Sequence, residues 1–140
     1  MKNSEMRSRV MAIGNRLAKA MPRKDAFIQA WQIIKSGSVT FPLRGVMEGS
    51  RQEALRRLSN YAQEQVHALI VPEPENEFDH NALAVMVFVN GGKGIYKLGY
   101  IPAKETAKAA AIQGRASIRV VSGSWGFCGV THGARLTLAV

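Results

Sequence analysis

Cysteine is almost absent from this sequence, because Cys128 is the only one among 140 residues. No disulfide can form within the chain, and a reducing compartment suits it. Long apolar runs are absent as well, since no stretch approaches the roughly 20 residues that a helix needs to cross a membrane. The opening residues, MKNSEMRSRV, lack the apolar core of a signal peptide. These absences lead us to expect a cytoplasmic protein without a membrane partner.

Acidic residues are also scarce, with ten Asp and Glu against nineteen Lys and Arg, which gives a net charge of +9. Such an excess favours a polyanionic partner, because each phosphate that is neutralised releases a bound counterion. The charge is uneven, since residues 1–40 hold eight basic and two acidic groups. With 46% hydrophobic residues, the chain is expected to be globular, with one domain and a small accessory element.

The basic N-terminal segment has the periodicity of a helix. Its apolar residues recur at intervals of four, three, four and four, at Met6, Val10, Ile13, Leu17 and Met21. We expect Pro22 to end this helix, Asp25 to cap a second one and Gly37 to follow the second one. Residues 1–37 are therefore predicted to form a basic helical hairpin.

Aromatic and basic side chains of this hairpin have two interpretations. Phe27 and Trp31 share a helical face with Ile34, which favours packing over base stacking. The cations either are solvated or extend a phosphate track along a bound strand. They are Arg7, Arg9, Arg16, Lys19, Arg23 and Lys24.

From residue 38 the pattern changes to short strands, predicted within 38–47, 65–72, 81–90, 95–102, 116–123 and 134–140. A helix is predicted after Ser50, which with Glu53 has the spacing of a capping box. Leu55, Leu58 and Ala62 would form its buried face. A second helix, within 103–114, would stop at Gly114. The predicted fold class is mainly β with α: a small, strongly curved sheet or barrel of five or six strands with two short helices, spanning 38–140.

The loop EPENEFDHNALAV, residues 73–85, concentrates carboxylates in this basic chain. Alternating acids suggest calcium, but Phe78 stands where an EF-hand needs Gly, and Ala84 where it needs a bidentate Glu. A two-metal nuclease would need carboxylates from separate elements. Cys128 and His132 supply only half a zinc site. We therefore expect no metal and no cofactor.

A purely structural interpretation of this loop is a tight turn. Asn76, Asp79 and Asn81 would bend back onto the backbone as Asx turns, and Phe78 would tuck inward as a plug. The residue types favour this interpretation when they are considered alone.

The same residues also resemble a known family. EPENEFDHNALAV, followed by KLGYIP at 97–102, is similar to the HIRAN domain pattern EP-x-N-x-[YF]-D-x-NA-[IL]-x-V and its later G-[YH]-[IL]-P. The preceding GSRQEALRRL resembles the corresponding segment of stand-alone bacterial and phage members. The resemblance covers about residues 40–140 and excludes the hairpin.

The resemblance implies an OB-like β-barrel that binds single-stranded DNA, with preference for a free 3′ end, in repair or replication. Asp79 would accept a hydrogen bond from the terminal 3′-hydroxyl, which only a strand end offers, and Asn76 would hold the loop or a base edge. Phe78 would stack on a base. Arg51 would meet a phosphate at its helix start.

The resemblance assigns two further positions and reveals one departure. Tyr100 would lie beside the nucleotide, and Lys104 would be a basic contact at the next helix. Gln52 replaces a second aromatic residue, which removes one stacking surface. The chain lacks a GxxxxGK[ST] loop, so no motor is expected.

Three functions follow as expectations. The first is a non-catalytic module that binds single-stranded DNA ends. The second is an adaptor that captures a replication, repair or phage protein through a strand or the hairpin. The third is a metal-dependent nuclease.

Overall fold

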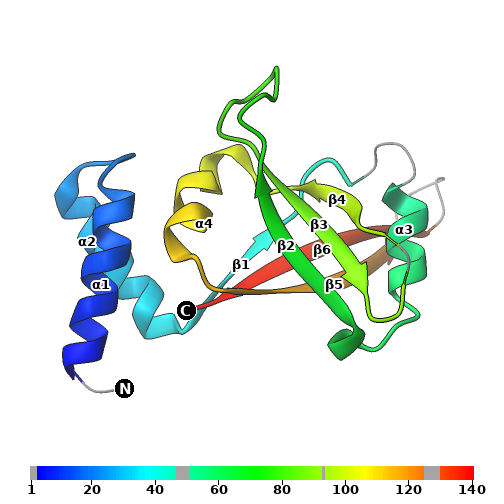
Figure 1. The fold of residues 1–140 in the computed structure, drawn as a ribbon, viewed down its shortest axis with the longest axis horizontal. Coiled ribbons are helices and arrows are strands. Elements are labelled where there is room, and N and C mark those ends of the chain that lie inside the picture. The colour runs from blue at the N-terminus through cyan, green and yellow to red at the C-terminus, as the bar shows by residue number, and fades with distance from the viewer. Residues whose placement is uncertain (1–2, 47–50, 93, 125–129) are drawn as a thin grey trace. The chain divides into compact units, whose positions relative to one another are not determined.

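The computed structural model describes the backbone of residues 3–46, 51–92, 94–124 and 130–140, and their side chains except those of 121–124 and 130–132. These residues form mixed α and β structure, with four α-helices and six strands in the part described (Figure 1). In chain order the elements are α1 (Asn3–Leu17), α2 (Arg23–Ser36), β1 (Ser38–Pro42), α3 (Arg51–Leu58), the 3-10 turn η1 (Gln63–Gln65), β2 (Val66–Pro72), β3 (Leu83–Val89), β4 (Tyr96–Tyr100), the 3-10 turn η2 (Ala103–Glu105), α4 (Thr106–Ile112), β5 (Arg115–Ser124) and β6 (Val130–Ala139). The predicted helices and strands are therefore confirmed as elements.

The chain divides into two compact units. The first unit consists of Met1–Val39, Ala107–Arg115 and Leu138–Val140. The second unit consists of Thr40–Thr106 and Ala116–Thr137. The first unit contains the predicted hairpin together with α4 and the last residues of the chain.

The first unit is built on the packing of α1 against α2. The predicted stripe on α1 is buried at Val10, Ile13 and Leu17. Gly14 lies directly against the ring of Phe27, which would be 2.6 Å from an added Cβ atom. Phe27 is therefore a packing residue, as predicted.

Two expectations for α2 were wrong. Pro22, rather than Asp25, occupies the N-cap, and Asp25 lies in the first turn. Proline suits a helix start because its ring fixes φ and it lacks an amide hydrogen that would need a partner. Trp31 is exposed, since the small residues Ala26 and Ala30 make the buried face with Ile33.

Left-handed backbone ends two of the helices. Gly37, at φ +77°, caps α2, and its N–H donates to the Ile33 carbonyl at 3.1 Å, as predicted. After α4 the left-handed residue is Gln113, at φ +48°, rather than the predicted Gly114. Gly114 is needed for another reason, because an added Cβ would collide with the Ala139 carbonyl oxygen.

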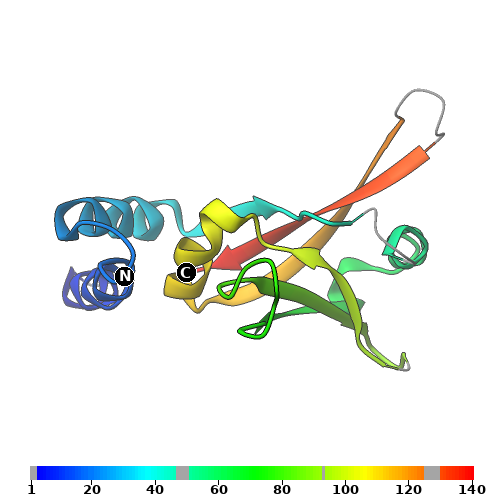
Figure 2. The ribbon, with the colours of Figure 1, turned by 90° about the horizontal axis from the view of Figure 1, so that it is seen from above.

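Two three-stranded sheets form, with orders β1-β6-β5 and β2-β3-β4. In the first, Thr40 pairs with Thr137 and Leu43 N–H bonds to Ala134 O, so β1 and β6 run antiparallel. Figure 2 shows β6 running beside β5. In the second sheet, β3 pairs antiparallel with β2 from Val66↔Val89 to Pro72↔Leu83, and with β4. The strands β3 and β4 thus form an antiparallel hairpin.

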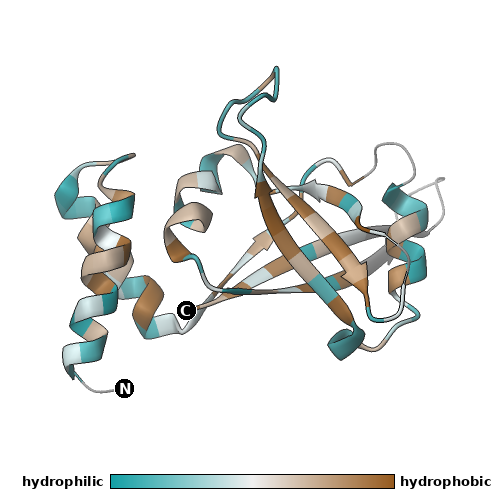
Figure 3. Cartoon of the chain, viewed as in Figure 1, coloured by the Kyte–Doolittle hydropathy of each residue, from teal (hydrophilic) through white to brown (hydrophobic). Residues whose placement is uncertain are grey.

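The core of the second unit includes apolar side chains from β3, β4 and α3. Val85, Val87 and Leu98 are fully buried and come from β3 and β4, where apolar residues are dense (Figure 3). Leu55 and Leu58 turn one face of α3 inward, as predicted. Ala62, predicted to extend that face, is exposed because it lies beyond the end of α3.

Among the described residues, no helix is long and apolar enough to span a membrane.

Candidate nucleic-acid interface

The acidic loop joins β2 to β3 and is closed by its own polar groups. Glu73 N–H donates to the Ala82 carbonyl at 2.9 Å, next to the last strand pair. Asn76 Oδ1 accepts from the N–H groups of Phe78 and Asp79 at 2.9 and 3.1 Å. These bonds are Asx turns, as the structural interpretation of the sequence predicts. The loop backbone is thus fixed without any ligand.

Phe78 lies at the tip of this fixed loop and is 96% exposed. The prediction that it plugs the fold is therefore wrong. Ala82 and Leu83, farther along the chain, take the buried positions instead. A fully solvated phenyl ring on a restrained backbone gains nothing from the core of this unit.

Asp79 is half-buried and only partly used by the loop. Its Oδ1 accepts from Asn81 N–H at 2.9 Å, and its carbonyl accepts from Ala82 N–H at 3.1 Å. Among the described residues, nothing donates a hydrogen bond to its second carboxylate oxygen. Beside it, His80 Nδ1 lies 3.0 Å from the Pro74 carbonyl oxygen.

Glu73, at the base of the loop, is the centre of a polar cluster. Lys97 Nζ lies 2.5 Å from its Oε2, and the Tyr100 hydroxyl donates to Oε1 at 2.9 Å. Asn76 Nδ2 donates to the same Oε1 at 3.2 Å. The Lys97 ammonium, with help from Asn76 and Tyr100, lowers the pKa of Glu73. In return, the Glu73 carboxylate raises the pKa of Lys97.

Tyr100 connects this cluster to the start of α3. Its ring centroid is 5.6 Å from the Arg51 guanidinium carbon and 5.3 Å from Lys97 Nζ, distances suited to cation–π contact. Arg51 Nη1 also donates to the Gly45 carbonyl at 2.5 Å. Arg51, Asn76 and Tyr100 are thus linked, through the Tyr100 ring and the Glu73 carboxylate. Lys97 was missed, although its position in KLGYIP, three residues before Tyr100, could have drawn attention to it.

Gln52, like Arg51, hydrogen-bonds to the segment that follows β1. Its Nε2 donates to the Val46 carbonyl at 3.1 Å, next to the Gly45 carbonyl that Arg51 holds. Gly45 adopts φ +73°, which explains a glycine at this turn. Both side chains therefore help to fix Gly45 and Val46.

The strand β4 pairs with the same segment, which follows β1. Arg44 and Tyr100 exchange two backbone hydrogen bonds of 2.8 Å each. The approach is close at Gly99, where an added Cβ would lie 2.5 Å from the Arg44 carbonyl oxygen. This pairing places the Tyr100 ring next to Arg51.

Lys104 lies on η2, four residues after Tyr100, and is exposed. No hydrogen bond or ion pair among the described residues joins it to the cluster. It is available to solvent near the end of β4.

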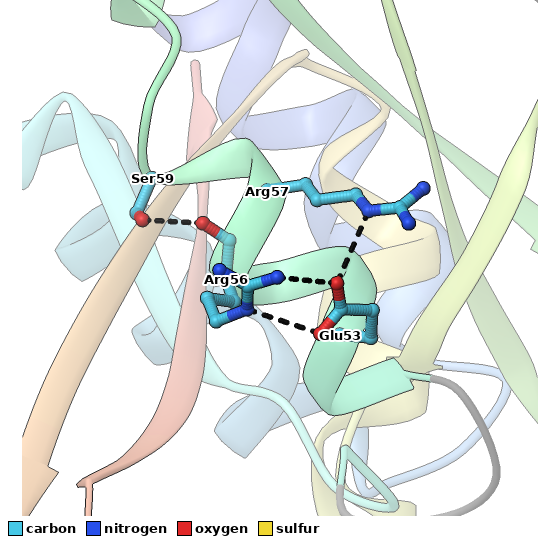
Figure 4. A network of polar contacts seen from close by, with 4 residues as sticks. All are labelled: Glu53, Arg56, Arg57 and Ser59. Atoms are coloured by element: carbon cyan, nitrogen blue, oxygen red, sulfur yellow. Dashed lines mark hydrogen bonds and ion pairs between the residues drawn. The ribbon is translucent and has the colours of Figure 1, made fainter.

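On α3, the Glu53 carboxylate binds two arginines (Figure 4). Its carboxylate accepts from Arg56 at 2.5 and 3.0 Å, and from Arg57 Nε at 3.2 Å. The Arg56 contact is the first cause that lowers the pKa of Glu53. Ser50, the other half of the predicted capping box, lies outside the described residues.

Within the part of the chain that the structure describes, no three His, Cys, Asp or Glu side chains gather as a metal site would require. Of the predicted half zinc site, Cys128 and the side chain of His132 lie outside that part. Comparisons with protein-family models, curated proteins and solved structures find no match to this chain.

Proposed function

We propose that this chain is a non-catalytic module that binds single-stranded DNA at a free 3′ end. The observation that carries the proposal is the ring of Phe78, which is 96% exposed on a loop that its own Asx bonds hold in place. Base–aromatic stacking contributes about 1 to 3 kcal/mol per base, and an already ordered loop loses little entropy on binding.

Asp79 would make the site selective for an end. A carboxylate repels the phosphates of a strand interior but accepts a hydrogen bond from an unblocked hydroxyl. One Asp79 oxygen is used by Asn81 N–H, which leaves the other for this role. The nearby cations Arg51 and Lys104 would hold the phosphates, so the polymer is attracted while its terminus is recognised.

The proposed fold is the OB-like barrel of a HIRAN-type domain. Two contacts support closure of the sheets β1-β6-β5 and β2-β3-β4 into one ring. The backbone pair of Arg44 and Tyr100 joins the chain after β1 to β4. Gln63 Nε2, just before β2, donates to the Ile118 carbonyl on β5 at 3.0 Å. The strand ends at both seams are thus connected.

The deciding experiment compares otherwise identical single strands that end in a 3′-hydroxyl or a 3′-phosphate, with a circular strand as the third arm. We expect the 3′-hydroxyl strand to bind most tightly by fluorescence anisotropy. Phe78→Ala should weaken that binding by about 5-fold or more, on the stacking energy above, without changing the melting temperature. Phe78→Tyr should retain it.

Equal affinity for the hydroxyl and phosphate ends would remove the role of Asp79, and no binding at low salt would remove the proposed function. Incubation of the labelled strand with Mg²⁺ or Mn²⁺ in the same assay tests for cleavage, which would instead favour a nuclease.

A second candidate is the adaptor that captures a replication, repair or phage protein. It is favoured by apolar side chains exposed on the hairpin, namely Met11, Ile28 and Trp31. Unlike the DNA proposal, it predicts that Trp31→Ala abolishes partner binding in a pull-down while Phe78→Ala has no effect.

A further inference from the structure

A pocket of about 330 Å³ lies along α3, from Glu53 in its first turn to Tyr61 beyond its last residue, and its lining residues do not include the loop of Phe78. Its walls come from α3 and the segment after it, and from the β3–β4 hairpin, and include Arg57, Leu58, Tyr61, Val89 and Tyr96. All of them belong to the second compact unit. The volume is at the lower end of the range for small-ligand sites, about 300 to 1,000 Å³. It suits one planar group better than a large cofactor.

Two tyrosines give the pocket aromatic walls. Tyr61 and Tyr96 are 49% and 50% exposed, so each ring has surface left for a ligand. Leu58, by contrast, is buried and contributes an apolar surface to the pocket. Aromatic rings beside an apolar surface are suited to stacking on a flat heterocycle.

Arg57 adds a positive charge to the pocket. Only its Nε bonds to Glu53, and its two terminal nitrogens point away from that carboxylate (Figure 4). Among the described residues, these terminal nitrogens have no hydrogen-bond partner. Because Glu53 also binds Arg56, one carboxylate compensates two guanidinium groups. The pocket edge therefore has unused donors with the fork geometry that a phosphate prefers.

The pocket and the proposed end site both involve α3 and β4. Arg51 and Arg57 are separated along α3 by about 9 Å, at about 1.5 Å per residue. Tyr100 and Tyr96 are separated along β4 by about 13 Å, at about 3.3 Å per residue. Because α3 packs against β4, the two separations are measured along neighbouring elements of the same unit. A single strand held at one end would meet the pocket within a few nucleotides.

We propose that this pocket binds an interior nucleotide of the same single strand whose 3′ end occupies the Phe78 site. Tyr61 and Tyr96 stack on the base, and Arg57 binds the adjoining phosphate. The inference rests on the proposed function and extends it, because it assigns a second subsite to the strand. An apolar peptide is a poorer occupant, since it offers only neutral carbonyl oxygens, and no anion, to the terminal nitrogens of Arg57.

The test compares a 3′-hydroxyl dinucleotide with an oligonucleotide of about eight nucleotides, a length within the site sizes of single-strand binders. Tyr61→Ala should weaken binding of the longer strand by about 5-fold or more and leave the dinucleotide unchanged. Tyr61→Phe should restore the affinity, because it keeps the ring.

A matched pair of arginine variants tests the phosphate contact. Arg57→Ala should lower the slope of log affinity against log salt for the longer strand by about 0.7, the value of one phosphate contact on single strands. Arg56→Ala should not, since Arg56 binds the same Glu53 but does not line the pocket.

Unchanged affinity of Tyr61→Ala for the longer strand would overturn the second subsite and leave the end site standing. An equal loss on both oligonucleotides would also overturn it, since the effect would then not depend on strand length. Failure of the unmodified protein to bind either strand would overturn the end site as well.

Discussion

Glu73 is the residue on which the order of the candidate interface depends. Its carboxylate receives Lys97, Tyr100 and Asn76, and so links β4 to the loop that carries Phe78. A side chain with three partners from two segments restricts the loop more than a solvated acid would. The acidic character of the loop is therefore partly structural.

The titration of Glu73 gives a prediction with a definite sign. Its pKa is lowered from 4.5, so the charged form stabilises the folded state above that pH, and this stabilisation is lost as the pH falls through the lower folded value. For Lys97 the pKa is raised from 10.5, so its contribution is complete below that pH and is lost as the pH rises further. We expect Glu73→Gln to lower the free energy of unfolding at neutral pH by about 1 kcal/mol.

Urea unfolding at a series of pH values measures this effect. The curves of the unmodified protein and Glu73→Gln should converge in acid, below the ordinary carboxyl range. Glu75→Gln is the control, because Glu75 is exposed in the same loop and its side chain makes no hydrogen bond or ion pair among the described residues. Parallel curves for Glu73→Gln would contradict the structural role.

At the scale of elements, the approach of β4 to the segment after β1 decides whether Tyr100 and Arg51 meet. Gly99 permits it, because the Arg44 carbonyl oxygen occupies the space that a Cβ would need. The colliding atom belongs to the backbone and cannot turn aside as a side chain would.

We expect Gly99→Ala to destabilise the protein by about 1 to 3 kcal/mol, the usual cost of overpacking. Calorimetry should show a lower melting temperature, and hydrogen exchange should be faster at the amides of Arg44 and Tyr100, which pair across this contact. Binding of the 3′-hydroxyl strand should weaken as Tyr100 loses its position. An unchanged melting temperature would contradict the close approach.

The elements themselves could be predicted from local pattern. Helical spacing identified α1, since Val10, Ile13 and Leu17 are buried together, and apolar runs bounded by turns identified β2 and β3. These patterns reflect interactions between residues close in sequence. The Asx bonds of Asn76 were predicted for the same reason, because they span only two or three residues.

What could not be predicted depends on contacts distant in sequence. Trp31 and Phe78 are large apolar residues, yet both are exposed, because smaller neighbours occupy the buried positions. The ion pair of Glu73 with Lys97 joins the loop after β2 to β4, two segments that are distant in sequence and that no local pattern brings together. The arrangement of the strands into two sheets likewise depends on contacts between residues that are distant in sequence.

At the scale of the whole molecule, the proposed binding of single-stranded DNA should depend on salt, because the chain has a net charge of +9. The slope of log affinity against log salt counts the phosphates that the protein neutralises. We expect Lys104→Ala to reduce this slope by about 0.7 while reducing affinity similarly for every sequence. Anisotropy titrations at several salt concentrations provide the measurement.

An unchanged slope would remove Lys104 from the interface. The same titration with Arg7→Ala and Arg9→Ala distinguishes the two interpretations of the hairpin cations. A reduced slope would place them on a phosphate track, and an unchanged slope would leave them as solvated charges.

The composition of the first compact unit has a consequence for the order in which the chain folds. Arg16 on α1 donates to the Ala111 carbonyl on α4 at 2.7 Å across 95 positions, and Val140 N–H donates to the Gly37 carbonyl. Such distant contacts close slowly, because a long loop must lose its freedom before they form. The hairpin of α1 and α2 can assemble early from neighbouring residues, whereas α4 and the last residues can join it only after the intervening strands have brought them back. Refolding should therefore protect the amides of α1 before those of α4.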